Sequence, residues 1–176
     1  MNFIRVVALA GLFCLVSSFG VAQREICVGR VGGGDAPTWN IQQPIYQAVT
    51  KEATSRGDKV TVQLMMAYND KGAKGEMQAM KCDFGLVINA SREWPTPKGS
   101  GGINKDDSKD DEKNPHPSST AFLEFTLLDK NAKKIDKFKT KIEMKAGATA
   151  KDVQPELQEI IQELANWTLD GTIAAK

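Results

Sequence analysis

The sequence predicts an α/β protein built on a single mixed β-sheet. Two observations carry this prediction. Short apolar runs rich in β-branched residues alternate with stretches of helical periodicity, and the last third holds two alternating apolar-polar segments followed by an amphipathic helix. The expected order is strand, helix, strand, short helix, strand, strand, strand, helix, with about five strands in the sheet and the helices packed on it.

The first half contains two strand-helix units and a third strand. The first strand, 26–31, runs into a triglycine turn at 32–34, and the helix expected over 42–55 ends before Gly57. The second strand covers 59–66 and is β-branched in its first part.

The remaining elements of the first half are a short helix and a buried strand. Gly72 and Gly75 mark the exit from the second strand, and residues 73–80 are rich in helix formers. The strand expected over 82–90 is almost continuously apolar, which indicates burial on both faces. Right-handed crossovers would make the first and third strands parallel neighbours.

The second half begins with a long polar stretch, 95–119, which is predicted to be a disordered loop because it has few residues that could bury apolar surface. Alternating segments at 121–127 and 138–144 predict a hairpin with one buried face, turning over 129–134. Lysines on its outer face would discourage edge-to-edge aggregation.

The last predicted element is an amphipathic helix. Asp152 is the expected N-cap, Gly171 the expected end, and Trp167 and Leu169 are expected to pack on the sheet. Its apolar stripe consists of Val153, Leu157, Ile160, Ile161 and Leu164.

The amino terminus predicts export. Arg5 precedes an unbroken apolar run at 6–16, which is too short for a bilayer-spanning helix and fits the core of a signal peptide. Small residues before the expected cut place cleavage between Ala22 and Gln23. The alternative, an uncleaved anchor, lacks the basic cluster that would hold it in place. We therefore expect an exported protein, periplasmic or secreted, with no stable membrane anchor after cleavage.

Removal of residues 1–22 from the 176 leaves 154, the size of one domain, 23–176. Loss of Arg5 takes the 23 basic residues down to 22, against 22 acidic ones. A formal charge of zero gives no electrostatic reason to expect nucleic acid or an anionic membrane as partner.

Two cysteines remain after the signal, which takes Cys14 with it. Cys27 and Cys82 form an even pair in an oxidising compartment, and a structural disulfide is the expected result. The alternative, a redox-active pair, normally has Cys-x-x-Cys spacing, whereas these two residues are far apart in sequence. If the first and third strands are neighbours, both cysteines lie at the same end of the sheet.

No motif predicts a catalytic, cofactor or metal site. The glycines at 29–34 lack dinucleotide-binding spacing. The acidic run at 106–112 lacks the central glycine of a calcium loop, and a cation-binding loop there is a third hypothesis. His116, the single histidine, lies between prolines in the polar stretch. Trp39 and Trp94 follow the first and third strands, at the end of a parallel sheet where ligands often bind.

A family resemblance agrees with this interpretation. The strand order, Ile26-Cys27-Val28-Gly29, the Lys81–Ile88 segment and the terminal amphipathic helix resemble the bacterial envelope domains of the TolB amino-terminal and curli-secretion-channel type. The resemblance implies a non-enzymatic α/β domain that contacts another envelope protein, and it carries over no functional residue.

The predicted function is therefore an exported binding or scaffold domain of the bacterial envelope, without cofactor. The alternative is an enzyme with an unrecognised site near Trp39 and Trp94.

Overall fold

The computed structural model describes residues 23–33, 41–93, 118–146, 148 and 151–175. Several predictions of the sequence fall outside these residues and stay predictions. They concern the signal peptide with Ala22, the two tryptophans Trp39 and Trp94, the acidic run at 106–112 and His116.

The described residues form three helices and one five-stranded sheet, as the sequence predicts. The elements in chain order are β1 (Arg24–Gly32), α1 (Gln42–Arg56), β2 (Val60–Leu64), α2 (Asp70–Met80), β3 (Phe84–Glu93), β4 (Ser119–Asp129), β5 (Lys134–Met144) and α3 (Gln154–Ala174). The strand order across the sheet is β2-β1-β3-β4-β5. β1 is parallel to both β2 and β3, and β3-β4-β5 is antiparallel, so the predicted parallel pairing of the first and third strands is confirmed.

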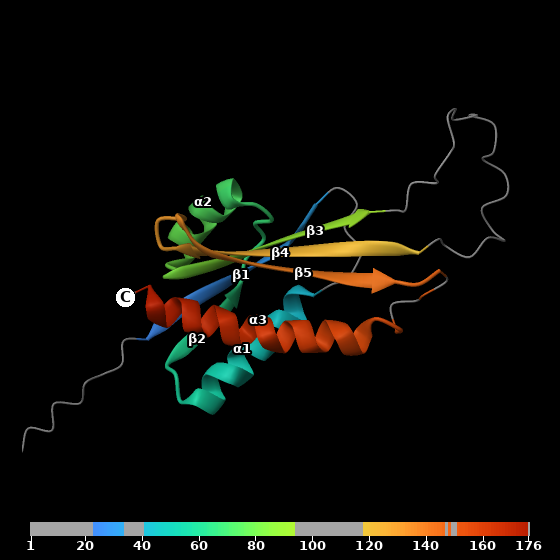
Figure 1. Cartoon of the computed structure of the whole chain (residues 1–176). Coiled ribbons are helices and arrows are strands. Elements are labelled where there is room, and N and C mark those ends of the chain that lie inside the picture. The colour runs from blue at the N-terminus through green and yellow to red at the C-terminus, as the bar shows by residue number, and fades with distance from the viewer. Residues whose placement is uncertain (1–22, 34–40, 94–117, 147, 149–150, 176) are drawn as a thin grey trace, which may run out of the picture.

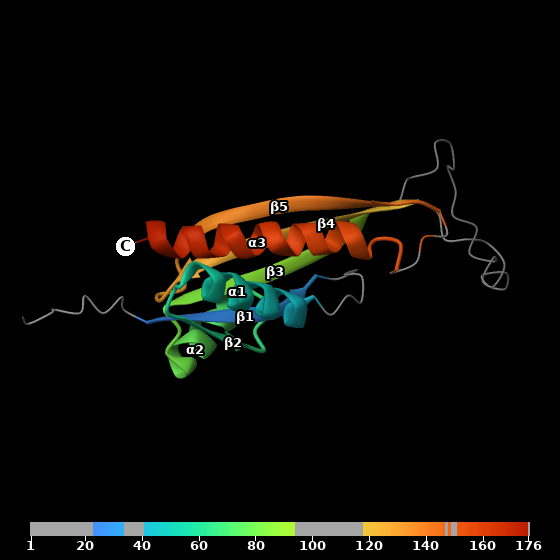
Figure 2. The same cartoon turned by 90° about the horizontal axis from the view of Figure 1, so that it is seen from below.

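The helices cover the two faces of the sheet unequally (Figures 1 and 2). α1 and α3 lie side by side on one face, whereas α2 lies on the other, over one end of the sheet. The far ends of β3, β4 and β5 extend beyond α2, so no described helix covers their outer face there.

Two apolar clusters follow from this arrangement. The larger lies between the sheet and the helices α1 and α3, and it includes the predicted stripe of α3 together with Leu169. Trp167 packs on Phe138 of β5, with ring centroids 5.8 Å apart, as predicted. The smaller cluster lies under α2 and contains Cys27, Met65, Ala67, Ala73, Met77, Cys82, Val87 and Leu128.

Helix α2 starts earlier than its glycines predict. Asn69 caps the helix, because its side-chain oxygen accepts a hydrogen bond of 2.8 Å from the Gly72 amide. Gly72 and Gly75 therefore lie inside α2, and the expectation that they mark the exit from β2 is wrong. A local cap at Asn69 outweighs the low helix propensity of two glycines.

Both predicted ends of α3 are also corrected. Its N-cap is Val153 rather than Asp152, and the helix runs past Gly171 to Ala174. A Cβ at Gly171 would lie 2.6 Å from a methyl of Leu127, so this glycine allows close packing on β4 rather than ending the helix.

The loop predicted over 95–119 is too long by at least one residue. Ser119 is the first residue of β4, pairs with Met144 of β5 and is buried. Its hydroxyl accepts a hydrogen bond from Arg92, which explains how a polar residue enters the strand.

Candidate functional site

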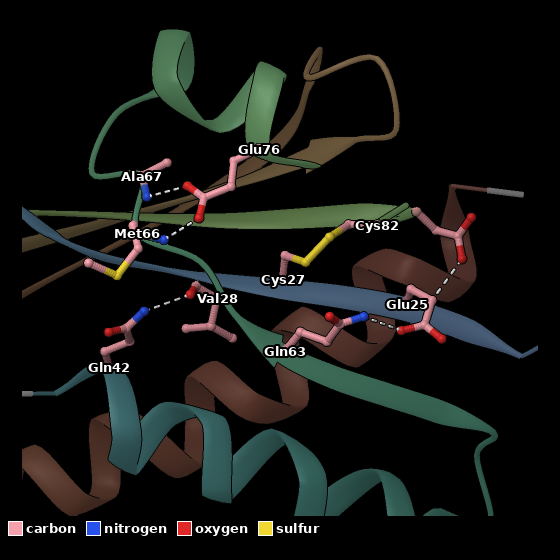
Figure 3. The surroundings of a disulfide bond; sticks show 10 residues. Glu25, Cys27, Val28, Gln42, Gln63, Met66, Ala67, Glu76 and Cys82 are labelled. Atoms are coloured by element: carbon pink, nitrogen blue, oxygen red, sulfur yellow. Dashed lines mark hydrogen bonds between the residues drawn. A yellow bond between two sulfur atoms is a disulfide. The ribbon is translucent and has the colours of Figure 1, made fainter. Parts of the chain in front are cut away.

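The predicted disulfide is present and lies under α2 (Figure 3). Cys27 lies in β1 and Cys82 lies just before β3, with 5.9 Å between their Cα atoms. Cys27 is fully buried and Cys82 is 4% exposed. The bond therefore joins β1 to the residues that directly follow α2, where the Cys82 amide donates a hydrogen bond to the Met77 carbonyl.

Helix α2 is also held by a close fit to β3. Met77 lies over Gly85, where a Cβ would come within 2.4 Å of the methionine sulfur. Gly85 is the residue of β3 that pairs with Cys27 of β1. The disulfide and this contact fix α2 over the same place in the sheet.

The chain leaves β2 as an irregular extension of the sheet edge. The Met65 amide donates to the Val28 carbonyl and the Arg30 amide donates to the Ala67 carbonyl, both over 2.9 Å. Residues 65–68 thus continue beside β1 with a bulge. Gly32 of β1 permits this approach, since a Cβ there would lie 2.4 Å from the Tyr68 carbonyl oxygen.

Two side chains pin this segment from opposite faces (Figure 3). The Glu76 carboxylate of α2 accepts hydrogen bonds from the amides of Met66 and Ala67, over 2.6 and 2.7 Å. From the other face, the side-chain amide (Nε2) of Gln42, at the start of α1, donates hydrogen bonds to the backbone carbonyls of Val28 and Met65, over 2.9 and 2.8 Å. Backbone groups that a bulge would leave unpaired are therefore satisfied.

The pinned segment exposes a run of large apolar side chains. Leu64 is 41% exposed, Met66 65% and Tyr68 60%. They alternate with the buried Met65 and Ala67, so one segment sends every second side chain into solvent. We call the exposed side chains of Leu64, Met66 and Tyr68 the apolar edge.

The apolar edge is the feature that the sequence analysis missed. Residues 60–69 contain no charged side chain, although they lie at an edge of the sheet. An uncharged window after a β-branched run is a usable signal, because exposed edge strands normally carry charges that prevent pairing with other chains. The fourth large exposed apolar side chain of the described residues, Ile173, stands apart on α3.

A second surface lies on the outer face of β3, β4 and β5, beyond α2. A depression of about 420 Å³ is lined there by Gly33 and by the side chains of Asn89, Ser91, Phe122, Glu124 and Lys139. We call these five side chains the polar shelf. It lies at the end of the sheet where β1 and β3 finish, which is the region that the sequence favoured for an enzymatic site.

The two ionisable groups of the polar shelf, Glu124 and Lys139, are paired with each other, and Glu124 is also paired with the neighbouring Lys137 of β5. Lys137 donates a hydrogen bond to the Glu124 carboxylate, and Lys139 lies 3.1 Å from its other oxygen. Both ammonium groups, Lys137 first, lower the pKa of Glu124. The carboxylate is thus held ionised and cannot serve as a proton donor near neutral pH.

No helix among the described residues combines the length and apolarity needed to cross a bilayer. Likewise, nowhere in the described ranges do three or more His, Cys, Asp or Glu side chains converge in a way that could hold a metal ion.

No protein-family model and no characterised protein matches the sequence. Among solved structures, the chain is similar to a single-substitution variant of the PelC dodecamer from Paraburkholderia phytofirmans, with 12% identity and a TM-score of 0.48 over 81% of this chain and 88% of that one. It is also similar to a second PelC dodecamer from the same organism, with 11% identity and a TM-score of 0.43 over 85% and 86%. A putative neuraminyllactose-binding hemagglutinin homolog from Helicobacter pylori has 9% identity and a TM-score of 0.44 over 88% and 91%.

These similarities are too distant to assign a family or to carry over a function. The resemblance to TolB amino-terminal and curli-channel domains therefore stays a prediction. Of the predicted site residues, Cys27 and Cys82 are brought together, and Gln23 lies directly before β1.

Proposed function

We propose that this protein is an exported, non-enzymatic binding domain that docks another protein of the bacterial cell envelope through the apolar edge. The observation that carries the proposal is the run of exposed apolar side chains at Leu64, Met66 and Tyr68. Apolar patches that stay exposed on an otherwise polar surface mark sites of protein contact.

The rigidity of the segment supports this proposal. Glu76 and Gln42 fix the backbone on both sides of Met66, so the apolar side chains are presented without a large loss of backbone freedom on binding. Methionine and tyrosine are also enriched in the centres of protein interfaces. A flexible loop with the same composition would lose more entropy when it bound.

Export is supported by the covalent chemistry. A buried disulfide between distant residues is typical of proteins that fold in an oxidising compartment, and the signal expected over 1–22 leads to such a compartment. Amino-terminal sequencing of the protein recovered from the compartment should begin at Gln23. A chain that still begins at Met1 would contradict export by cleavage.

The docking proposal is tested with paired variants of the tagged, exported protein. Cross-linking in living cells should join the wild type to a specific envelope protein that mass spectrometry identifies. The double variant Met66→Asp/Tyr68→Asp should lose this product, because two charges would be buried in an apolar contact. The matched control is Ile173→Asp, which places a charge on an isolated exposed apolar position.

Equal cross-linking by the wild type, the double variant and the control would contradict the apolar edge as the docking surface. Circular dichroism and thermal unfolding of both variants should coincide with the wild type, since all substituted side chains are exposed.

A further inference from the structure

The outer side of strand β2 pairs with no other strand of the described residues. Within the described ranges, β2 lies at the end of the strand order, and its one strand partner is β1. In a parallel ladder, alternate residues of a strand bond to the same neighbour. The Arg24 amide bonds to the Lys59 carbonyl and the Met65 amide bonds to the Val28 carbonyl, which assigns 59, 61, 63 and 65 to the β1 side. Val62 and Leu64 therefore direct their amides and carbonyls away from the sheet.

The Glu76 carboxylate limits the unpaired part of this edge at the carboxyl end of β2. The next outward amides, of Met66 and Ala67, are already bonded to Glu76. The unsatisfied part of the edge is thus confined to β2 itself, directly beside the exposed side chain of Leu64. Hydrogen-bonding groups and apolar side chains lie on one continuous surface.

From this juxtaposition we propose that an extended segment of the partner protein adds to β2 as a sixth strand. Main-chain hydrogen bonds form to Val62 and Leu64, and apolar side chains of the added segment contact Leu64 and Met66. This mode is β-strand addition, in which the backbone supplies affinity and alternating side chains supply specificity. It rests on the proposed docking function and names the chemistry of the partner, which is an uncharged, alternating apolar strand.

The absence of charge along the edge favours such an occupant. No residue from 60 to 69 is charged, and the Glu76 carboxylate, which reaches the end of this segment, already accepts hydrogen bonds from the Met66 and Ala67 amides. An apolar strand added along β2 would therefore meet no charged side chain of β2 itself. An acidic or basic strand would lose the hydration of its charges and gain no ionic partner from this window.

The size of the surface argues against a second copy of this chain as the occupant. The apolar edge consists of three part-exposed side chains, on the order of a few hundred Å², whereas a stable protein interface buries about 800 Å² on each partner. A short strand needs less area, because backbone hydrogen bonds supply part of its affinity.

The test distinguishes the contribution of the Leu64 backbone amide to peptide binding from the contribution of its side chain. Leu64→Pro removes the outward amide and leaves the ladder to β1 intact, since proline is tolerated where a strand's N–H faces away from the sheet. Leu64→Val is the matched control, because its side chain is similar in size to that of proline and it keeps the amide. Linear ten-residue peptides selected from a display library on the wild-type protein serve as the probe.

We expect Leu64→Val, which shortens one apolar contact but keeps the amide, to weaken peptide binding slightly. Leu64→Pro should bind the selected peptides about tenfold more weakly than Leu64→Val, the equivalent of roughly one lost hydrogen bond. Hydrogen exchange of the wild type gives a second reading that needs no variant. The amides of Val62 and Leu64 should gain protection when peptide binds, whereas those of β5 should not change.

Three results would overturn strand addition. The first is equal binding by Leu64→Pro and Leu64→Val, with no added protection at Val62 and Leu64. If Met66→Asp/Tyr68→Asp still abolishes binding in that case, docking through side chains stands and only the strand fails. The second is a selection that yields no peptide dependent on the apolar edge. The third is a wild-type dimer in light scattering that Leu64→Pro dissociates, which would make a second copy the occupant.

Discussion

The described sheet has two edge strands, β2 and β5, and the side chains at these two edges differ. On β5 the outward positions carry Lys137, Lys139 and Lys141, with Glu124 and Glu143 as their ionic partners. On β2 and the segment that follows it, the exposed positions carry Leu64, Met66 and Tyr68. We call the three lysines the lysine edge, in contrast to the apolar edge.

The contrast shows which edge is protected from other chains. A lysine brought against a second strand would lose its hydration, so the lysine edge resists pairing. The apolar edge has no such protection, yet hydrogen bonds from two helices hold it rigid. A sheet with lysines along one edge, and with a rigid second edge whose own side chains are uncharged, is suited to be joined by another strand at one side only.

The largest expected effect comes from removing the disulfide. The double variant Cys27→Ala/Cys82→Ala should lower the free energy of unfolding by about 2–5 kcal/mol, measured by urea denaturation. Because the bond anchors α2, hydrogen exchange should accelerate in α2 and at residues 65–68 and change little in β4 and β5. Uniform acceleration through the whole sheet would show that the disulfide does not serve the apolar edge in particular.

The second prediction concerns the glycine that lets the edge segment approach β1. Gly32→Ala places a Cβ 2.4 Å from the Tyr68 carbonyl oxygen, which should cost about 1–3 kcal/mol as the segment moves away. Gly75→Ala is the control, since its Cβ meets nothing within 4 Å, and in α2 it should stabilise by about 0.5–1 kcal/mol. Urea denaturation measures both variants, and equal effects of the two would contradict the close approach.

The third prediction concerns the removal of the Glu76 carboxylate, which accepts hydrogen bonds from two backbone amides of the apolar edge. Glu76→Ala should cost about 1–2 kcal/mol, because two amides lose a charged acceptor, and water replaces it only partly at this half-buried site. Glu76→Gln keeps one acceptor oxygen and should lose roughly half as much. The rate of hydrogen exchange at the Met66 and Ala67 amides should be lowest in the wild type, higher in Glu76→Gln and highest in Glu76→Ala. No acceleration in the Ala variant would show that Glu76 does not hold the segment.

The fourth prediction concerns pH and the lysine edge. Since Lys137 and Lys139 lower the pKa of Glu124 in the folded protein, their stabilisation is present above the ordinary value of 4.5 and is lost as the pH falls through the lowered value. Glu124→Gln should therefore destabilise by less than about 1 kcal/mol at neutral pH, given the solvent exposure of the pair. The difference from the wild type should vanish in acid. A difference that grows in acid would have the wrong sign.

The smallest expected change in stability comes from removing lysines. Lys139→Val/Lys141→Val should alter the free energy of unfolding by no more than about 0.5 kcal/mol, because both side chains are exposed. Light scattering at increasing concentration should nevertheless show stronger self-association, since the edge would lose its charge. Unchanged self-association of the double variant would contradict the proposed role of the lysines in preventing other chains from pairing with β5.

Sequence periodicity predicted the element order because it reflects which side chains must be buried. Element ends were less accurate, because they depend on single contacts. Asn69 starts α2 ahead of its glycines, and Gly171 continues α3 because Leu127 lies against it. The apolar edge was missed since Met65 and Met66 look alike in the sequence, and only the fold buries one and exposes the other.

The sequence by itself determined the α/β element order, the parallel pairing of β1 with β3 and the cysteines that could meet, because burial patterns and crossover handedness are properties of the chain. Only the tertiary structure decided which edge of the sheet is open and what holds it. The segment 65–68 is held by groups from three other elements. The Glu76 carboxylate of α2 and the side-chain amide of Gln42 in α1 form hydrogen bonds with its backbone, and Gly32 of β1 allows its close approach. Such convergence depends on packing between distant elements, which no local pattern records.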